Sequence, residues 1–530
     1  MIFDLSKLPD SPELSAQVCI IGAGVAGQAV AARLAAANID VVLIESGGTD
    51  FDSETQKLAE GRNIGETYYD LETTRLRLYG GTAAIWGGRC AELDAIDFEK
   101  RDYIPHSGWP ITKADLDPYY DKAFKTLGLK RQQYTDLWTQ TKGNKPPFDP
   151  AKLDPGFWSF DDNGERFTRT QNTGNARTLL NATVTEMDAD EAGVIRAVTA
   201  RSLNGKTANI TAKTFVIASG TIETVRLLMG SVPSRPNGLG NEHDHLGRYF
   251  MEHPHARGGQ ILTPDYAKSL LALPRALRIQ GRRYAGFLRP ADALQREAGI
   301  LNTSLSFAPR RHEGLQKDGL RAMKDKLKHD LPSTKFWRTS YKRLKGIGIK
   351  LREWTEPAPS VRKIHHAPDT FGLYAVIRAE QAPNPDSRIT LSADTDALGQ
   401  RRVDLDWRLS EIDKRSVRVL METLGAEYQR LGWGKVEPAP WLYDEGEPWK
   451  IDPLISSHHI GGYHHMGGTR MSASAKDGVV DANCRVHASP NLYIASSSVF
   501  PTGGWANPTV TIMALAERLA DHLIENNVKS

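Results

Sequence analysis

A two-domain α/β fold is predicted by three features of this 530-residue sequence. Near the N-terminus, short apolar strand patterns alternate with a helical pattern, as in a parallel sheet covered by helices. In the middle, alternating strand patterns separated by turn signals indicate a second, sheet-based α+β unit. A chain of this length also has room for two large folding units.

The composition is that of an ordinary globular protein, with 40% hydrophobic and 25% charged residues. A net charge of +3 gives no indication of nucleic-acid binding. No apolar run is long enough to predict a transmembrane segment, and the first residues lack the pattern of a signal peptide. The three cysteines Cys19, Cys90 and Cys484 are far apart. This spacing favours a reducing compartment, so we expect a cytoplasmic protein.

The N-terminal region carries a dinucleotide-binding pattern. An apolar strand at 17–21 runs into Gly22, Gly24 and Gly27, and a helical pattern and a second strand at 40–44 lead to Glu45. The glycines allow a tight turn and close approach of the backbone to a pyrophosphate at the helix N-terminus. Glu45 stands where a carboxylate binds ribose hydroxyls. The pattern predicts a Rossmann-type site for FAD or NAD, and a purely structural glycine turn is the alternative.

The segment 78–89 is unusually rich in glycine. Such a segment lets the backbone lie directly against a flat ligand, and its alternative interpretation is a surface loop. Ile85 is an unusual residue for such a loop, which favours the ligand-binding interpretation. The residues expected at the ligand are Gly80, Gly81, Thr82, Trp86 and Gly87.

The next predicted elements are a helix and a strand meander. Thr112, with Asp115 three residues later, is a predicted helix N-cap. Strands are expected at 183–188, 194–203, 208–212 and 214–218. The last strand leads through Ser219 into a helix, as in another βα unit. Further on, Ser410 with Asp413 predicts the start of an amphipathic helix.

The C-terminal region contains His464-His465-Met466-Gly467-Gly468-Thr469 and, later, Asn507-Pro508-Thr509. Oxidation of an alcohol needs a base for the hydroxyl proton and a polar group that holds the oxygen. We predict His465 as the base, because a neutral histidine suits this role, and Asn507 as the polar group. Asn507 before Pro508 could instead serve only as a helix N-cap. Four nearby histidines could suggest a metal, but no carboxylate or cysteine completes a familiar spacing, so none is predicted.

These motifs together resemble the glucose–methanol–choline (GMC) family of FAD-dependent oxidoreductases. The form His-X-Gly-Gly-Thr, followed by Ala-Asn-Pro-Thr, is most similar to its pyranose-oxidase-like branch. The resemblance implies oxidation of a CH–OH group to a carbonyl, with the hydride taken by flavin N5, on a sugar or glycoside. Ile85 occupies the position of the branch's flavin-linking histidine, which implies non-covalent FAD.

The resemblance also implies further contacts. His464 is expected beside the base in the substrate site, with a simply packed residue as the alternative. The helix from Pro508 is expected to stabilise the reduced flavin through its N-terminus. A structural role is favoured for His253, although it is a tempting ligand or acid. The additional cofactor contacts are Val184, Ala218, Ser219, Ser497, Ser498, Pro508 and Thr509.

The predicted domain organisation is discontinuous. An FAD-binding domain is expected from 1–100, 160–252 and 455–530, with a connecting segment at 101–159. A substrate-binding domain is expected at 253–454. Residues 260–370 match nothing in the family, and within them 321–352 is strongly basic with interleaved aromatic residues. We interpret this basic stretch as a solvated helical insertion, and a docking surface for an electron acceptor, an anionic membrane or a partner is the alternative.

Two other functions are consistent with the sequence. One is a dehydrogenase of aliphatic or aromatic alcohols that passes electrons to a quinone or cytochrome. The other is a non-catalytic flavin-binding subunit, against which the presence of both His465 and Asn507 argues. The sequence leaves open whether the acceptor is oxygen, a quinone or a redox protein, and whether the chain forms a homo-oligomer.

Overall fold

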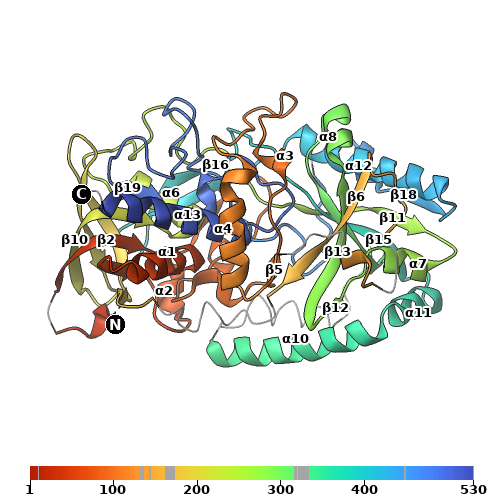
Figure 1. The fold of residues 1–530 in the computed structure, drawn as a ribbon, viewed down its shortest axis with the longest axis horizontal. Coiled ribbons are helices and arrows are strands. Elements are labelled where there is room, and N and C mark those ends of the chain that lie inside the picture. The colour runs from red at the N-terminus through yellow and green to blue at the C-terminus, as the bar shows by residue number, and fades with distance from the viewer. Residues whose placement is uncertain are drawn as a thin grey trace.

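The structure is a computed structural model that describes residues 1–9, 11–131, 137–141, 145–161, 173–315, 319, 334–446 and 449–528. Figure 1 shows a mixed α/β molecule with one large sheet at each end. Much of the predicted basic stretch, including Lys324, Lys326 and Lys328, lies outside the described residues.

The first sheet has a parallel centre and an antiparallel edge. Its strands, in spatial order, are β1 (Ile2–Asp4), β7 (Arg177–Leu180), β3 (Val41–Ile44), β2 (Glu13–Ile21), β10 (Thr207–Ile217), β9 (Ile195–Arg201) and β8 (Thr183–Ala189), with β19 (Leu492–Ile494) also paired to β10. The pairs from β1 to β10 and the β10–β19 pair are parallel, whereas β9 and β8 run antiparallel. The predicted Rossmann-type arrangement is confirmed by this sheet and its helices.

One part of the strand prediction was wrong. Two strands were expected at 208–212 and 214–218, but the structure has the single strand β10. Its residues pair with β2 from Asn209 to Ile217, so the continuous parallel partner keeps the whole segment extended.

The second sheet is antiparallel. Its strands are β18 (Lys435–Pro438), β11 (His255–Leu262), β15 (Phe371–Arg378), β14 (Ser304–Arg311), β13 (Arg282–Pro290), β6 (Leu153–Phe160) and β5 (Arg89–Cys90), with β12 (Leu277–Ile279) on β13. A small third sheet contains β16 (Arg388–Thr395), β17 (Arg401–Asp406) and β4 (Gly61–Asn63). Thus β6, from the expected connecting segment, is part of the second sheet.

The helices cover these sheets. They are α1 (Val25–Ala36), α2 (Ser53–Lys57), α3 (Ala95–Phe98), α4 (Lys113–Thr126), α6 (Gly220–Gly230), α7 (Tyr266–Ala272), α8 (Asp292–Ala298), α10 (Lys335–Thr355), α11 (Ala358–His366), α12 (Glu411–Arg430) and α13 (Thr509–Val528). Helix α13 packs between α1 and α4.

The predicted helix caps are confirmed. Thr112 and Asp115 form a capping box at α4, and Ser410 and Asp413 form one at α12.

Helix α10 runs along one side of the molecule, below β12 and β13 in the view of Figure 1. Its first amide, that of Lys335, donates to both carboxylate oxygens of Asp50 at 2.8 and 2.9 Å. Near its other end, Glu353 accepts from Arg278 at 2.9 Å. The helix is therefore tied at both ends to the body of the protein. No helix among the described residues is long and apolar enough to cross a membrane.

Candidate active site

A cavity of about 850 Å³ collects segments from both ends of the chain. Its wall contains most of the predicted cofactor and substrate residues. Those present are Gly22, Gly24, Glu45, Gly80, Gly81, Thr82, Trp86, Gly87, Val184, Ala218, Ser219, His464, His465, Ser497, Asn507, Pro508 and Thr509, with Ile85 among them. The sequence motifs, although up to several hundred residues apart, therefore meet around one space.

Two predicted residues lie behind this wall. A Cβ atom on Gly27 would stand 1.9 Å from the carbonyl oxygen of Gly22, so this glycine lets α1 pack against the turn that precedes it. Ser498 is fully buried and accepts a hydrogen bond from the hydroxyl of Thr469 at 2.7 Å. The structure thus gives Gly27 and Ser498 packing contacts rather than a place in the cavity wall.

The glycine-rich segments leave room for a flat ligand. A Cβ atom built on Gly24 or on Gly87 would meet no protein atom within 4 Å, although both residues line the cavity. Gly22 has a φ of +106° and stands so close to Ala218 that a Cβ would lie 2.7 Å from its carbonyl oxygen. This close approach joins the first turn to the end of β10. The cradle fits a dinucleotide cofactor at the N-terminus of α1.

Glu45 is held by the backbone at the end of β3. Its two carboxylate oxygens accept from the amides of Ala23 and Gly47, each at 2.9 Å. Burial raises the pKa of this carboxyl to about 7 against the effect of these hydrogen bonds. A carboxylate accepts several hydrogen bonds, so Glu45 keeps acceptor sites for ribose hydroxyls.

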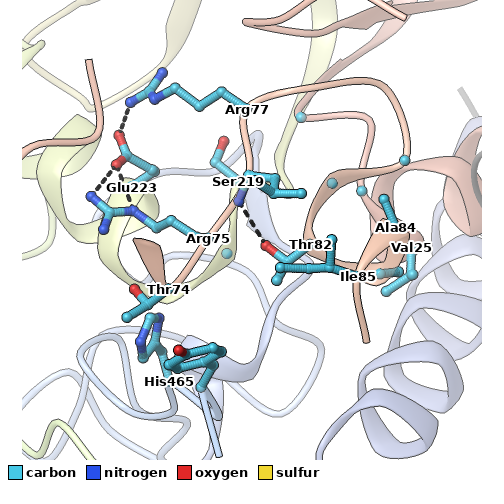
Figure 2. A pocket seen from close by; sticks show the side chains of 18 of the residues that line it. Val25, Thr74, Arg75, Arg77, Thr82, Ala84, Ile85, Ser219, Glu223 and His465 are labelled. Carbon is cyan, nitrogen blue, oxygen red and sulfur yellow. Dashed lines mark hydrogen bonds and ion pairs between the residues drawn. The ribbon is translucent and has the colours of Figure 1, made fainter. Parts of the chain in front are cut away.

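One wall of the cavity holds a charge cluster that the sequence analysis missed. Glu223, from α6, lies between Arg75 and Arg77, as Figure 2 shows. Arg75 donates to one carboxylate oxygen at 2.8 and 3.0 Å, Arg77 donates to the other, and Arg226 lies 3.6 Å away. These arginines hold the pKa of Glu223 far below its usual value despite burial. The cluster fixes the loop that carries Arg75 and Arg77 against α6.

His464 and Asn507 form the central contact of the site. Asn507 Nδ2 lies 2.8 Å from His464 Nε2, and His464 Nδ1 lies 2.8 Å from Nδ1 of His253. The other nitrogen of His253 lies 2.7 Å from the carbonyl oxygen of Gly504. A carbonyl only accepts, so His253 donates to Gly504 and accepts from His464. His464 Nε2 then carries a lone pair, which accepts from the amide of Asn507.

His465 has a different environment. Its Nε2 lies 3.0 Å from the hydroxyl of Tyr68, which donates to Glu252 at 2.5 Å. Because the hydroxyl proton is used on Glu252, the oxygen of Tyr68 accepts from His465. The sequence predicted His465 as the partner of Asn507, but the structure brings His464 to that position. Figure 2 shows His465 next to Thr74 at the end of the cavity drawn there.

All three histidines of this region are held neutral. Burial lowers the pKa of His464 well below its usual value, and the neighbouring histidines and Arg89 add to this effect. Burial also lowers the pKa of His465 to about 3 and that of His253 to about 4. A neutral imidazole with a free lone pair can accept a proton, whereas a protonated one cannot.

Comparisons with known proteins show what the chain is similar to. Residues 17–337 match the family described as FAD dependent oxidoreductase, and residues 383–516 match the family described as GMC oxidoreductase. The chain is 23% identical to the paromamine 6'-oxidase of Streptomyces fradiae over 95% of its length and 90% of that protein. It is 26% identical to the fructose dehydrogenase large subunit of Gluconobacter japonicus over 66% of its length and 54% of that subunit. The solved structure of pyridoxine 4-oxidase from Mesorbium loti covers 96% of this chain and 99% of its own, with 17% identity and a TM-score of 0.54.

The fold and the family match over more than half of the chain define an FAD-dependent oxidoreductase. The chain belongs, more specifically, to the GMC oxidoreductases. It is therefore an enzyme that uses FAD to oxidise a CH–OH group. The cavity described above is its candidate active site.

Proposed function

We propose that the enzyme oxidises a CH–OH group of a sugar or glycoside to a carbonyl, with His464 as the base and Asn507 as the group that holds the oxygen. The observation that carries this assignment is the 2.8 Å contact of His464 Nε2 with Asn507 Nδ2 at the cavity wall. The oxidase and dehydrogenase among the relatives, named for paromamine and fructose, support a sugar-like substrate.

FAD supplies the hydride acceptor when it is bound. The chain would hold it through the Gly22–Gly27 turn, Glu45 and the segment around Gly80 and Gly81. Ile85 offers no atom that could bond covalently to a flavin, which supports non-covalent binding. The N-terminal end of α13, where Pro508 and Thr509 line the cavity, favours negative charge nearby.

Each residue near the substrate has its own role in this proposal. When substrate binds, the amide of Asn507 leaves Nε2 of His464 and donates to the substrate oxygen as its negative charge grows. His464 Nε2 can then accept the hydroxyl proton. His253 keeps Nδ1 of His464 protonated, so the reactive lone pair stays on Nε2. In this assignment His465, which lies 3.0 Å from the hydroxyl of Tyr68, is a neighbour of the base.

An anaerobic absorbance titration tests this function. The purified protein with FAD is mixed with pyranoses, glycosides and simple alcohols, and the oxidised flavin band is followed. We expect the band to disappear with at least one sugar or glycoside, and readmitted air or added quinone then identifies the acceptor. A flavin that stays oxidised with every sugar and alcohol would contradict the proposal.

We also propose a cytoplasmic location. The three cysteines are all unpaired and buried in the structure, as in proteins of a reducing compartment. Fractionation of the source cells, with the flavoprotein detected by antibody, tests this location.

A further inference from the structure

Two arginines of the second sheet lie against the same tryptophan, and one of them borders the cavity. The guanidinium carbon of Arg89 in β5 is 4.4 Å from the ring centroid of Trp158, and that of Arg378 at the end of β15 is 5.3 Å from it. Trp158 is fully buried. Arg89 also lines the cavity together with His464. Two cations are thus stacked on one buried ring close to the proposed base.

Neither arginine has an acidic partner within the part of the chain that the structure describes. Arg378 donates to the hydroxyl of Ser306 at 3.2 Å, and Nε of Arg89 is buried without a hydrogen bond. Three more deeply buried arginines do have carboxylates. The pairs are Arg101 with Glu380 at 2.7 Å, Arg226 with Asp396 at 2.7 Å, and Arg257 with Asp452 at 2.6 Å.

Arg89 and Arg378 are half-buried, and a cation that loses part of its hydration without gaining a carboxylate is destabilised. Burial, with Arg378 and Arg283 nearby, lowers the pKa of Arg89 well below its usual value. Burial also lowers the pKa of Arg378 to about 10. An anion supplied by a ligand would remove this cost, because a guanidinium binds carboxylate or phosphate oxygens in a fork geometry.

We propose that Arg89 and Arg378 form an anion subsite and that the substrate is an acidic sugar or polyol, with a carboxylate or a phosphate. This inference rests on the proposed function and refines its substrate class. The anion takes no part in the redox step. The C–H hydrogen leaves with its electron pair to FAD, the hydroxyl proton goes to His464, and the C=O bond forms.

Matched substrates test the subsite. Glucose, glucuronate and glucose 6-phosphate, with the corresponding galactose and mannose series, share a ring and differ in the anion. We expect an acidic form to have the higher kcat/KM by about 10–100-fold, the range of one or two charge-assisted hydrogen bonds. Arg89→Met should remove this preference through KM and leave the neutral sugar unchanged, and Arg89→Lys should restore part of it.

Other outcomes would overturn the subsite. Equal use of neutral and acidic sugars would do so while leaving the proposed function intact. An equal loss with neutral and acidic sugars in Arg89→Met would mean that Arg89 serves the cofactor. If no sugar reduces the flavin, binding of glucuronate or inorganic phosphate to the oxidised enzyme still tests whether the anion subsite exists. An anion that perturbs the flavin spectrum in the wild type but not in Arg89→Met supports the subsite, and no such difference contradicts it.

A second, independent feature is an exposed apolar face of α10. Half of the large hydrophobic side chains that are exposed in the described residues belong to this helix. Their exposed fractions are 70% for Phe336, 49% for Trp337, 71% for Leu344, 66% for Ile347, 59% for Leu351 and 82% for Trp354. From Trp337 onward these residues follow one another at steps of three, four or seven, so they lie along one face of the helix.

Charge distinguishes the possible occupants of this face. By sequence, α10 contains seven Lys or Arg residues and one acid, Glu353, within a chain whose net charge is only +3. Pairing with α10 of a second copy would bring two strongly basic helices together, which is unfavourable. An anionic lipid surface accepts both the apolar stripe and the positive charge.

We infer that α10 docks on an anionic membrane surface while lying flat on it. The helix is fixed to the body at Asp50 and Arg278, so docking would orient the whole enzyme. Trp337, Ser340, Leu344 and Lys345 also line the cavity, so the first half of this face borders the cavity. Its second half, with Ile347, Leu351 and Trp354, is the part available to lipid.

Co-sedimentation with vesicles tests this surface. We expect the holoenzyme to bind phosphatidylglycerol–phosphatidylcholine vesicles at least about tenfold more than pure phosphatidylcholine, with binding reduced by salt. The triple variant Ile347→Gln, Leu351→Gln, Trp354→Gln should lose this binding. The control triple Ile64→Gln, Leu203→Gln, Tyr443→Gln changes exposed hydrophobic residues elsewhere and should keep it. Absence of binding, or a dimer that the first triple variant alone dissociates, would overturn the inference.

Discussion

Nε2 of His464 lies 2.8 Å from Nδ2 of Asn507, although the two residues are 43 positions apart in the chain. The amide can only donate, so this contact requires a lone pair on Nε2. His253 and the carbonyl of Gly504 fix the proton on the opposite nitrogen. The site therefore presents a neutral imidazole and an amide side by side, as the proposed roles of base and oxygen-holding group require.

Replacement of the two adjacent histidines should have unequal effects. His464→Ala removes the proposed base, so the rate of flavin reduction should fall by about 10²–10⁴-fold. His465→Ala removes the partner of Tyr68 and should lower the rate by no more than about tenfold. Stopped-flow absorbance with FAD bound to each variant measures both rates. If His465→Ala lowered the rate of flavin reduction more than His464→Ala does, His465 would be the base.

The pH dependence should follow from the lowered pKa of His464. The base works in its neutral form, and a pKa well below 6.5 keeps it neutral as the pH falls through that value. We therefore expect kcat/KM to show no decline between pH 8 and about pH 6 that depends on this histidine. A pH–rate profile that loses activity with an apparent pKa near 6.5 would show that the pKa of the base is not lowered.

Local signals in the sequence predicted local structure correctly. The capping boxes at Thr112 and Ser410 depend on residues three positions apart, so they could be identified without the fold. The glycine turn and Glu45 belong to one strand–helix–strand unit, and they too lie where the pattern indicated.

The choice between His464 and His465 could not be made in the same way. Adjacent side chains of an extended segment point in opposite directions, so the pairing of this segment with its neighbour decides which of the two histidines faces Asn507. Met466 pairs with Met251 through backbone hydrogen bonds of 2.9 Å in both directions, and Tyr463 has a φ of +61°. These long-range and strained features direct His464 to Asn507. Glu223 lies about 150 residues from Arg75 and Arg77, so no local pattern indicated their cluster.

Removal of the Glu223 carboxylate should destabilise the protein. Glu223→Gln would leave Arg75 and Arg77 without their shared anion, and loss of one partner of a buried pair costs about 3–5 kcal/mol. The free energy of unfolding in urea measures this loss. The matched variant Glu54→Gln, which breaks an exposed pair with Lys57, should cost less than about 1 kcal/mol.

The same carboxylate should contribute to acid sensitivity. Its pKa is depressed in the folded protein, so its contribution is present above the unfolded value of 4.5 and is lost as the pH falls below it. The difference in unfolding free energy between wild type and Glu223→Gln should shrink on acidification below 4.5. A difference that stays constant would show that the cluster does not depend on ionised Glu223.

Glu45 should determine how tightly the cofactor is held. Glu45→Gln retains the side-chain shape but loses an anionic acceptor for ribose hydroxyls and places an amide donor near backbone N–H groups. We expect FAD to bind about 10–100-fold more weakly, measured by the fluorescence of released FAD. Unchanged affinity would place the ribose elsewhere in the cavity.

The most direct test of the account is anaerobic reduction of the enzyme-bound FAD by a substrate deuterated at the carbinol carbon. Hydride transfer from that carbon, assisted by His464, predicts a reduction that deuterium slows several-fold and that His464→Ala slows further. Reduction with no isotope effect, at a rate that His464→Ala leaves unchanged, would contradict both the reaction and the base assigned to it.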